Sequence, residues 1–194
     1  MEIKPLFGIL SSIVVLIGGF PYIKDIYRRK ARPHVLSWLG WGFITSIGAF
    51  AMLASGSKWV VAILFANSLL CFIIVLFSII RKVAILSTTK FDYVFFGLGI
   101  LGLILWQTLD MPIFAIVCAI IADFSFGLPN IIKIYKKPKT ETHFIWLTAA
   151  ISGLFSMFAI ENFTFSQSGY PIYLFIYDTV VLLLVLKMIR KKQM

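Results

Sequence analysis

The sequence predicts an all-α integral membrane protein with seven transmembrane helices. Of its 194 residues, 60% are hydrophobic and only 13% are charged, which leaves too little polar surface to cover a water-soluble domain. The hydrophobic residues gather in seven runs, each close to the roughly 20 residues that a helix needs to cross a bilayer. Short basic segments separate alternate runs, as expected for a chain that crosses a membrane repeatedly.

The seven expected helices follow one another with short connections. In chain order they are 5–28, 34–55, 58–80, 91–109, 112–135, 142–162 and 169–188. The first is expected to be retained, because residues 1–4 lack the basic start of a signal peptide and no small-residue cleavage site follows. The second and sixth each begin after a basic loop. Residues that favour helix starts introduce the other four: Ser57, Thr89, Asp110 with Pro112, and Pro171.

The distribution of Lys and Arg on alternate sides of these helices predicts the orientation. Sixteen of the eighteen lie on one side, in clusters at 24–32, 81–90, 133–139 and 187–192, and only Lys4 and Lys58 lie on the other. Because loops rich in Lys and Arg stay in the cytoplasm, the N-terminus is expected outside and the C-terminus in the cytoplasm. With an even number of helices, the basic clusters would no longer all lie on one side of the membrane.

A segment near the end of the first helix returns near the end of the fifth. Residues 19–29 read GFPYIKDIYRR, and residues 127–137 read GLPNIIKIYKK. Four residue pairs in or after the two copies are 108 positions apart: Pro21 and Pro129, Ile26 and Ile134, Tyr27 and Tyr135, Trp38 and Trp146. The sequence therefore predicts a parallel 3+1+3 duplication, with a three-helix repeat at 1–83, a linker helix at 84–110 and a second three-helix repeat at 111–194.

Each copy of this segment carries a proline inside an apolar helix. Proline removes a backbone hydrogen bond and bends the helix, which membrane helices tolerate where neighbours cover the freed carbonyl. We therefore expect Pro21 and Pro129 to act as hinges.

The motif G-x-P-x-I-x-x-I-Y-[RK]-[RK], repeated within the 3+1+3 plan, resembles the SWEET, SemiSWEET and PQ-loop (MtN3-saliva) transporter superfamily. Tyr22 and Asn130 stand where PQ-loop proteins have the glutamine that follows the proline. Parallel repeats of this kind enclose a substrate site near the bilayer midplane. The resemblance implies a small-solute transporter that works by alternating access, in which the two three-helix bundles rock around that site.

Asn67 and Asp178 are polar residues near the middle of the third and seventh helices, 111 positions apart. In the resembled superfamily an Asn pair on these helices binds the substrate, so the resemblance implies a substrate-binding role for both residues. The alternative for Asn67 is a hydrogen bond to a neighbouring helix, which is worth about 0.6 kcal/mol in membrane proteins.

Asp123 and Asp178 are the costliest residues of the expected membrane core. An ionised Asp near the centre of a membrane helix costs roughly 2.5–3.5 kcal/mol, and no basic residue lies at the same depth. A water-filled cavity or a bound proton removes this cost, because burial disfavours the ionised form of a carboxyl group. Both residues are therefore candidates for proton coupling, although a polar helix-packing contact is the alternative for Asp123. Asn130 shares a helix face with Asp123 and is a further candidate for substrate binding.

Four smaller candidates lie near the outer halves of the second and sixth helices. Phe50 and Phe158 are 108 positions apart and are expected either to flank a substrate or to pack in the core. Ser46 and Ser156 lie near them and could supply hydroxyl groups to the same substrate.

Other aromatic residues lie near the expected helix ends, where anchoring at the membrane interface is the default. Trp38 and Trp146 follow the two basic loops, so interfacial anchoring is expected for them, with gating as the alternative. Tyr170 and Tyr173 are expected to be anchors as well.

The expected function is transport of a small solute across the cell (inner) membrane. The solute is a sugar, an amino acid or a cationic metabolite, and transport is either proton-coupled or facilitated, by a monomer or a homo-oligomer. No motif for an enzyme, a metal or a cofactor occurs, and the net charge of +10 sits in loop clusters rather than on a face for nucleic acid. The expected partners are the substrate, the lipid bilayer and protons. A ligand-binding or sorting receptor of the same fold is the alternative.

Overall fold

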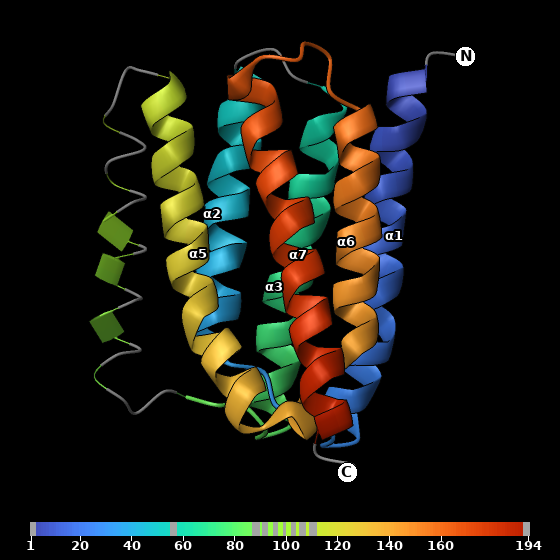
Figure 1. Cartoon of the computed structure of the whole chain (residues 1–194), viewed down its shortest axis with the longest axis vertical. Coiled ribbons are helices and arrows are strands. Elements are labelled where there is room, and N and C mark those ends of the chain that lie inside the picture. The colour runs from blue at the N-terminus through green and yellow to red at the C-terminus, as the bar shows by residue number, and fades with distance from the viewer. Residues whose placement is uncertain are drawn as a thin grey trace.

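The helices of the bundle run side by side in the computed structural model (Figure 1). The structure describes residues 3–54, 58–86 and 112–191, together with 90, 93, 94, 97, 98, 100, 101, 104 and 108. Its α-helices are α1 (Ile3–Tyr27), α2 (Val35–Ala54), α3 (Val60–Ile80), α5 (Pro112–Lys136), α6 (His143–Phe158) and α7 (Phe165–Lys191), with a short 3-10 helix, η1 (Pro138–Thr140), between α5 and α6. The expected helix 91–109 falls mostly outside the described residues, as do Ser57, Thr89 and Asp110; the described positions within 91–109 are helical.

The helices have the length and composition of a membrane-embedded protein. Four of them, α1, α3, α5 and α7, contain apolar stretches long enough to cross a membrane, whereas the apolar stretches of α2 and α6 are shorter. Large apolar side chains cover the outside of the bundle: Phe20 is 78% exposed, Leu183 60% and Leu69 56%. Exposure of such an apolar surface to water is unfavourable, whereas its contact with lipid is not.

The helices pack in a pattern that has an internal symmetry. Helix α1 packs against α3 and α6, α5 packs against α7 and α2, and the remaining close pairs are α2 with α3 and α6 with α7. If α1 is exchanged with α5, α2 with α6 and α3 with α7, the same six close pairs result. The two chain ends lie at opposite ends of the bundle (Figure 1).

Single glycines allow the closest of these helix contacts. A Cβ atom on Gly18 of α1 would overlap the side chain of Thr148 on α6, and one on Gly40 of α2 would overlap the ring of Phe126 on α5. Positions 18 and 126, like positions 40 and 148, are 108 apart. Gly18 therefore corresponds to Phe126, and Gly40 corresponds to Thr148. Both helix contacts join the same pair of equivalent positions, but the glycine is at the first position in one contact and at the second in the other.

The end of the bundle that carries the C-terminus is called the basic end here, because most Lys and Arg side chains belong to its loops and helix ends. Helices α1 and α3 both finish there with a residue in the left-handed region, Arg29 at φ 58° and Lys82 at φ 54°. In each case the amide of this residue bonds back into the last turn, Arg29 N to Ile26 O at 2.9 Å and Lys82 N to Ile79 O at 3.0 Å. The amide that follows bonds one residue further back, Lys30 N to Asp25 O at 2.8 Å and Val83 N to Ser78 O at 3.0 Å. This arrangement closes both helices where the basic loops begin.

Two of the expected helix boundaries differ from the structure by four residues. Helix α6 ends at Phe158 rather than at 162, and α7 begins at Phe165 rather than at 169, so Pro171 lies inside α7. The earlier start follows from local hydrogen bonds, because the amides of Gln167 and Ser168 both bond to the carbonyl oxygen of Thr164, at 3.0 and 2.9 Å. These bonds form the first turn of α7 before the proline is reached.

Candidate functional site: an acidic cavity inside the bundle

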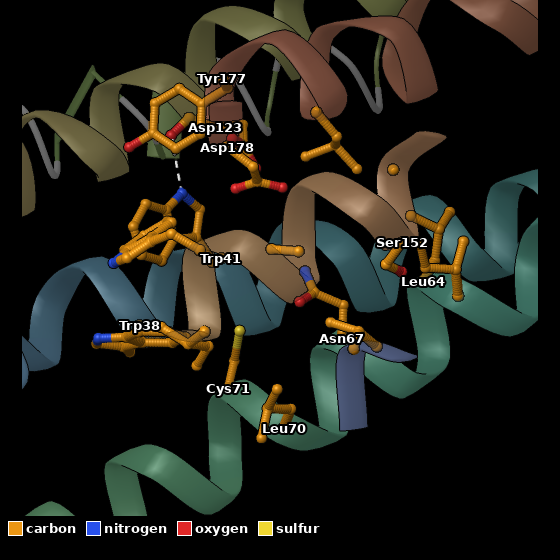
Figure 2. Close-up of a pocket in the computed structure, with 17 residues that line it drawn as sticks. Trp38, Trp41, Leu64, Asn67, Leu70, Cys71, Asp123, Ser152, Tyr177 and Asp178 are labelled. Carbon is orange, nitrogen blue, oxygen red and sulfur yellow. Dashed lines mark hydrogen bonds between the residues drawn. The ribbon is translucent and has the colours of Figure 1, made fainter. Parts of the chain in front are cut away.

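A cavity lies inside the bundle, and all six α-helices named above contribute to its wall. Its lining includes Asn67, Asp123 and Asp178 among mostly apolar and aromatic side chains (Figure 2). The volume open to the centres of water-sized spheres is ≈ 50 Å³. Because one water needs about 10–15 Å³ by this measure, the cavity has room for a few water molecules in this conformation.

Asp123 is held in place by two tyrosines and a tryptophan. The hydroxyl groups of Tyr170 and Tyr173 donate to its two carboxyl oxygens at 2.9 and 2.8 Å, and the indole N–H of Trp41 donates to its backbone oxygen at 3.2 Å. Asp123 is only 2% exposed, so these donors replace most of the water that a carboxylate would otherwise bind. A phenolic hydroxyl can donate to a carboxylate or accept from a carboxylic acid, so the same cage suits either protonation state.

Asp178 differs from Asp123 because its carboxyl group is left open. It has no hydrogen-bond or ion-pair partner in the part of the chain that the structure describes. Figure 2 shows Asp178 of α7 and Asn67 of α3 extending into the cavity from facing helices. A carboxylate and an amide therefore remain available to whatever enters the space between them.

Aromatic rings form the wall of the cavity toward the basic end. Trp38 lies against Trp41 and Trp146, with ring centroids 5.3 and 6.2 Å apart. The Trp41 ring in turn meets Trp146 at 5.9 Å and Tyr177 at 6.1 Å. All four residues line the cavity and are at most 7% exposed.

The cavity wall repeats the internal spacing of the sequence. Three pairs of lining residues on α1 and α5 or on α2 and α6 are 108 positions apart, and two pairs on α3 and α7 are 111 apart. They are Val15 and Asp123, Trp38 and Trp146, Trp41 and Ala149, Ile63 and Leu174, and Asn67 and Asp178. Both acidic members belong to the second set of helices, and their counterparts in the first set, Val15 and Asn67, are neutral.

A buried ion pair lies beyond the aromatic wall, toward the basic end. Lys133 of α5 pairs with Glu141, and the two side chains are 4% and 0% exposed. Glu141 also accepts the indole N–H of Trp146 at 3.3 Å, and Lys133 donates to the backbone oxygen of Arg32 at 3.1 Å. Trp146 therefore connects the cavity wall to this ion pair. Lys133 itself does not line the cavity, and no other Lys, Arg or His among the described residues does.

Comparison with protein-family models, with curated proteins and with solved structures gave no match. The interpretation of the cavity therefore rests on its own geometry and on the sequence.

The structure brings together only some of the residues that the sequence singled out. Asn67, Asp123 and Asp178 line the cavity. Asn130 does not, although it is fully buried in α5 and both of its amide atoms lack a hydrogen-bond partner among the described residues. Pro21 and Pro129 lie inside α1 and α5, as expected, and their role as hinges remains a prediction.

The four candidates from the outer halves of the second and sixth helices lie outside the cavity lining. Phe50 and Phe158 are 64% and 54% exposed, so they face the surroundings of the bundle instead. Ser46 donates to the carbonyl oxygen of Gly42 at 2.8 Å, and Ser156 donates to that of Gly153 at 2.7 Å. The Ser46 hydroxyl also shares a hydrogen bond with that of Ser68 on α3, at 2.5 Å. Both candidate hydroxyl groups therefore bond within the bundle rather than to the cavity.

The interfacial positions expected for Trp38, Trp146, Tyr170 and Tyr173 are wrong. Both tryptophans are 4% exposed and line the cavity, and both tyrosines bond to Asp123. The sequence contained a signal for the tyrosines. Tyr170, Tyr173 and Tyr177 follow i, i+3, i+7 spacing and so lie on one face of a helix, next to Asp178. A buried carboxylate needs donors, and this face supplies them.

Proposed function

We propose that this protein is a small-solute transmembrane transporter that works by alternating access, a multi-pass protein of the cell (inner) membrane with seven helices in a 3+1+3 arrangement. The observation that carries the proposal is the internal cavity, whose lining combines two carboxyl groups and an amide with mostly apolar and aromatic side chains. Polar groups this deep in a membrane protein are costly and usually mark a pathway.

The symmetry of the cavity wall supports two like-oriented repeats around a central site. Residue pairs 108 or 111 positions apart line the same cavity, and the close helix contacts repeat when one set of three helices is exchanged for the other. Transporters built from parallel repeats have their substrate site at the repeat interface. In the proposed arrangement this interface contains the cavity, because α1, α2, α3, α5, α6 and α7 all line it.

The two ends of the cavity differ in how they are closed. Toward the basic end, the tryptophan wall is followed by the Lys133–Glu141 pair. Toward the other end, Val60 packs with Ala159 and Ile160, and Phe7 and Trp59 lie against them. In the proposed cycle these two barriers open in turn, and Pro21 and Pro129 allow α1 and α5 to bend as the basic end opens.

We assign the two acidic residues different tasks within this proposal. Asp178 is open to the cavity and is the substrate ligand, together with Asn67. Asp123 is held by hydroxyl groups that suit either protonation state, which makes it the candidate for carrying a proton.

Proteoliposomes that contain the purified chain test the transport proposal. They are offered a panel of labelled sugars, amino acids, vitamins and organic cations, with and without an inward proton gradient. We expect gradient-driven accumulation of at least one solute relative to empty liposomes. Asp123→Asn should retain exchange of that solute and lose its accumulation. Accumulation by this variant equal to that of the unsubstituted chain would remove the proton-coupling assignment, and uptake of nothing on the panel would count against transport.

A receptor that binds a carboxylate-bearing ligand is less well supported than transport. Such a site requires cations that face the ligand, and no Lys, Arg or His among the described residues lines the cavity. In the proteoliposome experiment, a receptor would bind a solute without moving it.

A further inference from the structure

We propose that the substrate of the cavity is a small organic cation with an ammonium group, bound by Asp178 and Asn67 against the tryptophan wall. This inference rests on the proposed transport function and names the chemical class of its substrate.

The first argument is charge. The cavity wall contains two carboxyl groups, and no basic side chain of the described residues shares it. Whenever either carboxyl group is ionised, its charge repels an anion and attracts a cation, because the surrounding apolar groups screen little. A neutral solute gains nothing from this charge, whereas a cation neutralises it.

The second argument is the unequal state of the two acids. Both carboxyl oxygens of Asp123 already accept tyrosine hydroxyl groups. Asp178 has no such donor among the described residues, so its oxygens are free to accept from a ligand. An N–H group of an ammonium ion supplies both the missing donor and the missing charge, and a charge-assisted bond is stronger than a neutral one.

The third argument is the aromatic wall. Trp38, Trp41 and Trp146 share the cavity with Asp178, and Trp is the side chain whose face binds a cation best. Where water is excluded this attraction adds to that of the carboxylate. Tryptophan rings and a carboxylate in one cavity recognise a cation, whether it is a primary or a quaternary ammonium ion.

The fourth argument is the asymmetry of the cavity. The positions related to Asp123 and Asp178 in the first set of helices are Val15 and Asn67, so both negative groups come from α5 and α7. A bound cation therefore has one preferred orientation, with its ammonium group toward Asp178 of α7. A symmetric pair of amides would not impose this direction.

Binding to the full-length chain in detergent tests the substrate class. Trp38, Trp41 and Trp146 line the cavity, so their fluorescence reports occupancy. The probes are choline, ethanolamine in its ammonium form, and 3,3-dimethylbutan-1-ol, the neutral carbon isostere of choline. We expect at least one of the two cations to bind roughly 10-fold or more tightly than the neutral isostere.

Substitutions identify the group responsible. Asp178→Asn should weaken cation binding roughly 10- to 100-fold, since it removes a charge-assisted contact. Asp178→Glu keeps the charge and should stay much closer to the original affinity. Glu161→Gln removes an acidic group outside the cavity and should leave the affinity unchanged.

The outcomes separate the substrate class from the transport proposal. If choline and its isostere bind equally tightly, or if neither cation binds, the inference is overturned. This comparison uses the unsubstituted chain alone, so it does not depend on the variants. Cation binding without uptake into proteoliposomes supports the ligand class and removes transport. Uptake of a neutral solute by a chain that binds no cation supports transport and overturns the ligand class.

Discussion

Trp38 and Trp146, which lie 108 positions apart in the sequence, meet inside the bundle with ring centroids 6.2 Å apart. Each comes from the start of a helix that follows a basic loop, and each is 4% exposed. Their contact forms the wall of the cavity toward the basic end. The same pair therefore contributes both to the stability of the bundle and to the barrier on that side of the cavity.

Truncation of one indole should destabilise the bundle. Trp38→Ala removes ring contacts with Tyr22, Trp41 and Trp146 and leaves a void, which costs about 3–5 kcal/mol in protein cores. Unfolding in SDS titrations of mixed micelles measures the change. The control is Phe20→Ala, because Phe20 is 78% exposed and its loss should change stability by roughly 0.5 kcal/mol or less. Equal effects of the two substitutions would contradict the packing described here.

The contact between α1 and α6 predicts opposite effects for two glycine substitutions. Gly18→Ala forces a methyl group against Thr148, whose hydroxyl is held by the carbonyl oxygens of Phe144 and Ile145 at 3.0 Å each. Overpacking of this kind costs about 1–3 kcal/mol. A Cβ on Gly48 meets only Leu64 Cδ1 at 3.8 Å, so Gly48→Ala should be neutral or stabilise the helix by about 0.5–1 kcal/mol. Thermal unfolding in detergent compares them, and a stable Gly18→Ala variant would argue against the close approach of α1 and α6.

The ion pair near the basic end predicts a strong dependence of stability on both partners. Lys133→Met leaves the Glu141 carboxylate buried without its cation, which costs about 3–5 kcal/mol in other proteins. The double variant Lys133→Met/Glu141→Gln removes both charges and should recover most of the loss. The same SDS titration gives the coupling energy between the two positions. A double variant no more stable than Lys133→Met would show that the pair is not the source of the effect.

The positions of the helices could be predicted because they depend on local sequence. An apolar run of sufficient length specifies a membrane helix, and the basic clusters mark its ends. The errors occurred where the apolar pattern continues through a connection. In the segment from 159 to 164, Ala159 and Ile160 are buried and apolar although they no longer belong to α6.

The inward faces of the helices could not be predicted in the same way. In lipid, the outer surface of a helix is as apolar as its inner surface, so hydrophobicity does not separate them. Phe50 and Phe158 were expected to flank a substrate or to pack in the core, and they are exposed. Trp38 and Trp146 were expected at the membrane interface, with gating as the alternative, and they line the cavity. Polar residues were more informative. Asn67, Asp123 and Asp178 all line the cavity, because each has a polar group that lipid cannot satisfy.

Access of water to Cys71 tests the central claim most directly, since Cys71 lines the cavity and is 1% exposed in this conformation. In a Cys118→Ser background it is the single thiol of the chain. Sealed proteoliposomes are treated from each side with a cationic (trimethylammonium) or an anionic (sulfonate) methanethiosulfonate reagent of similar size. An acidic cavity that opens in turn to both sides predicts modification from either side, faster with the cationic reagent. A thiol that reacts from neither side, yet reacts fully once the protein is unfolded in SDS, would contradict the account.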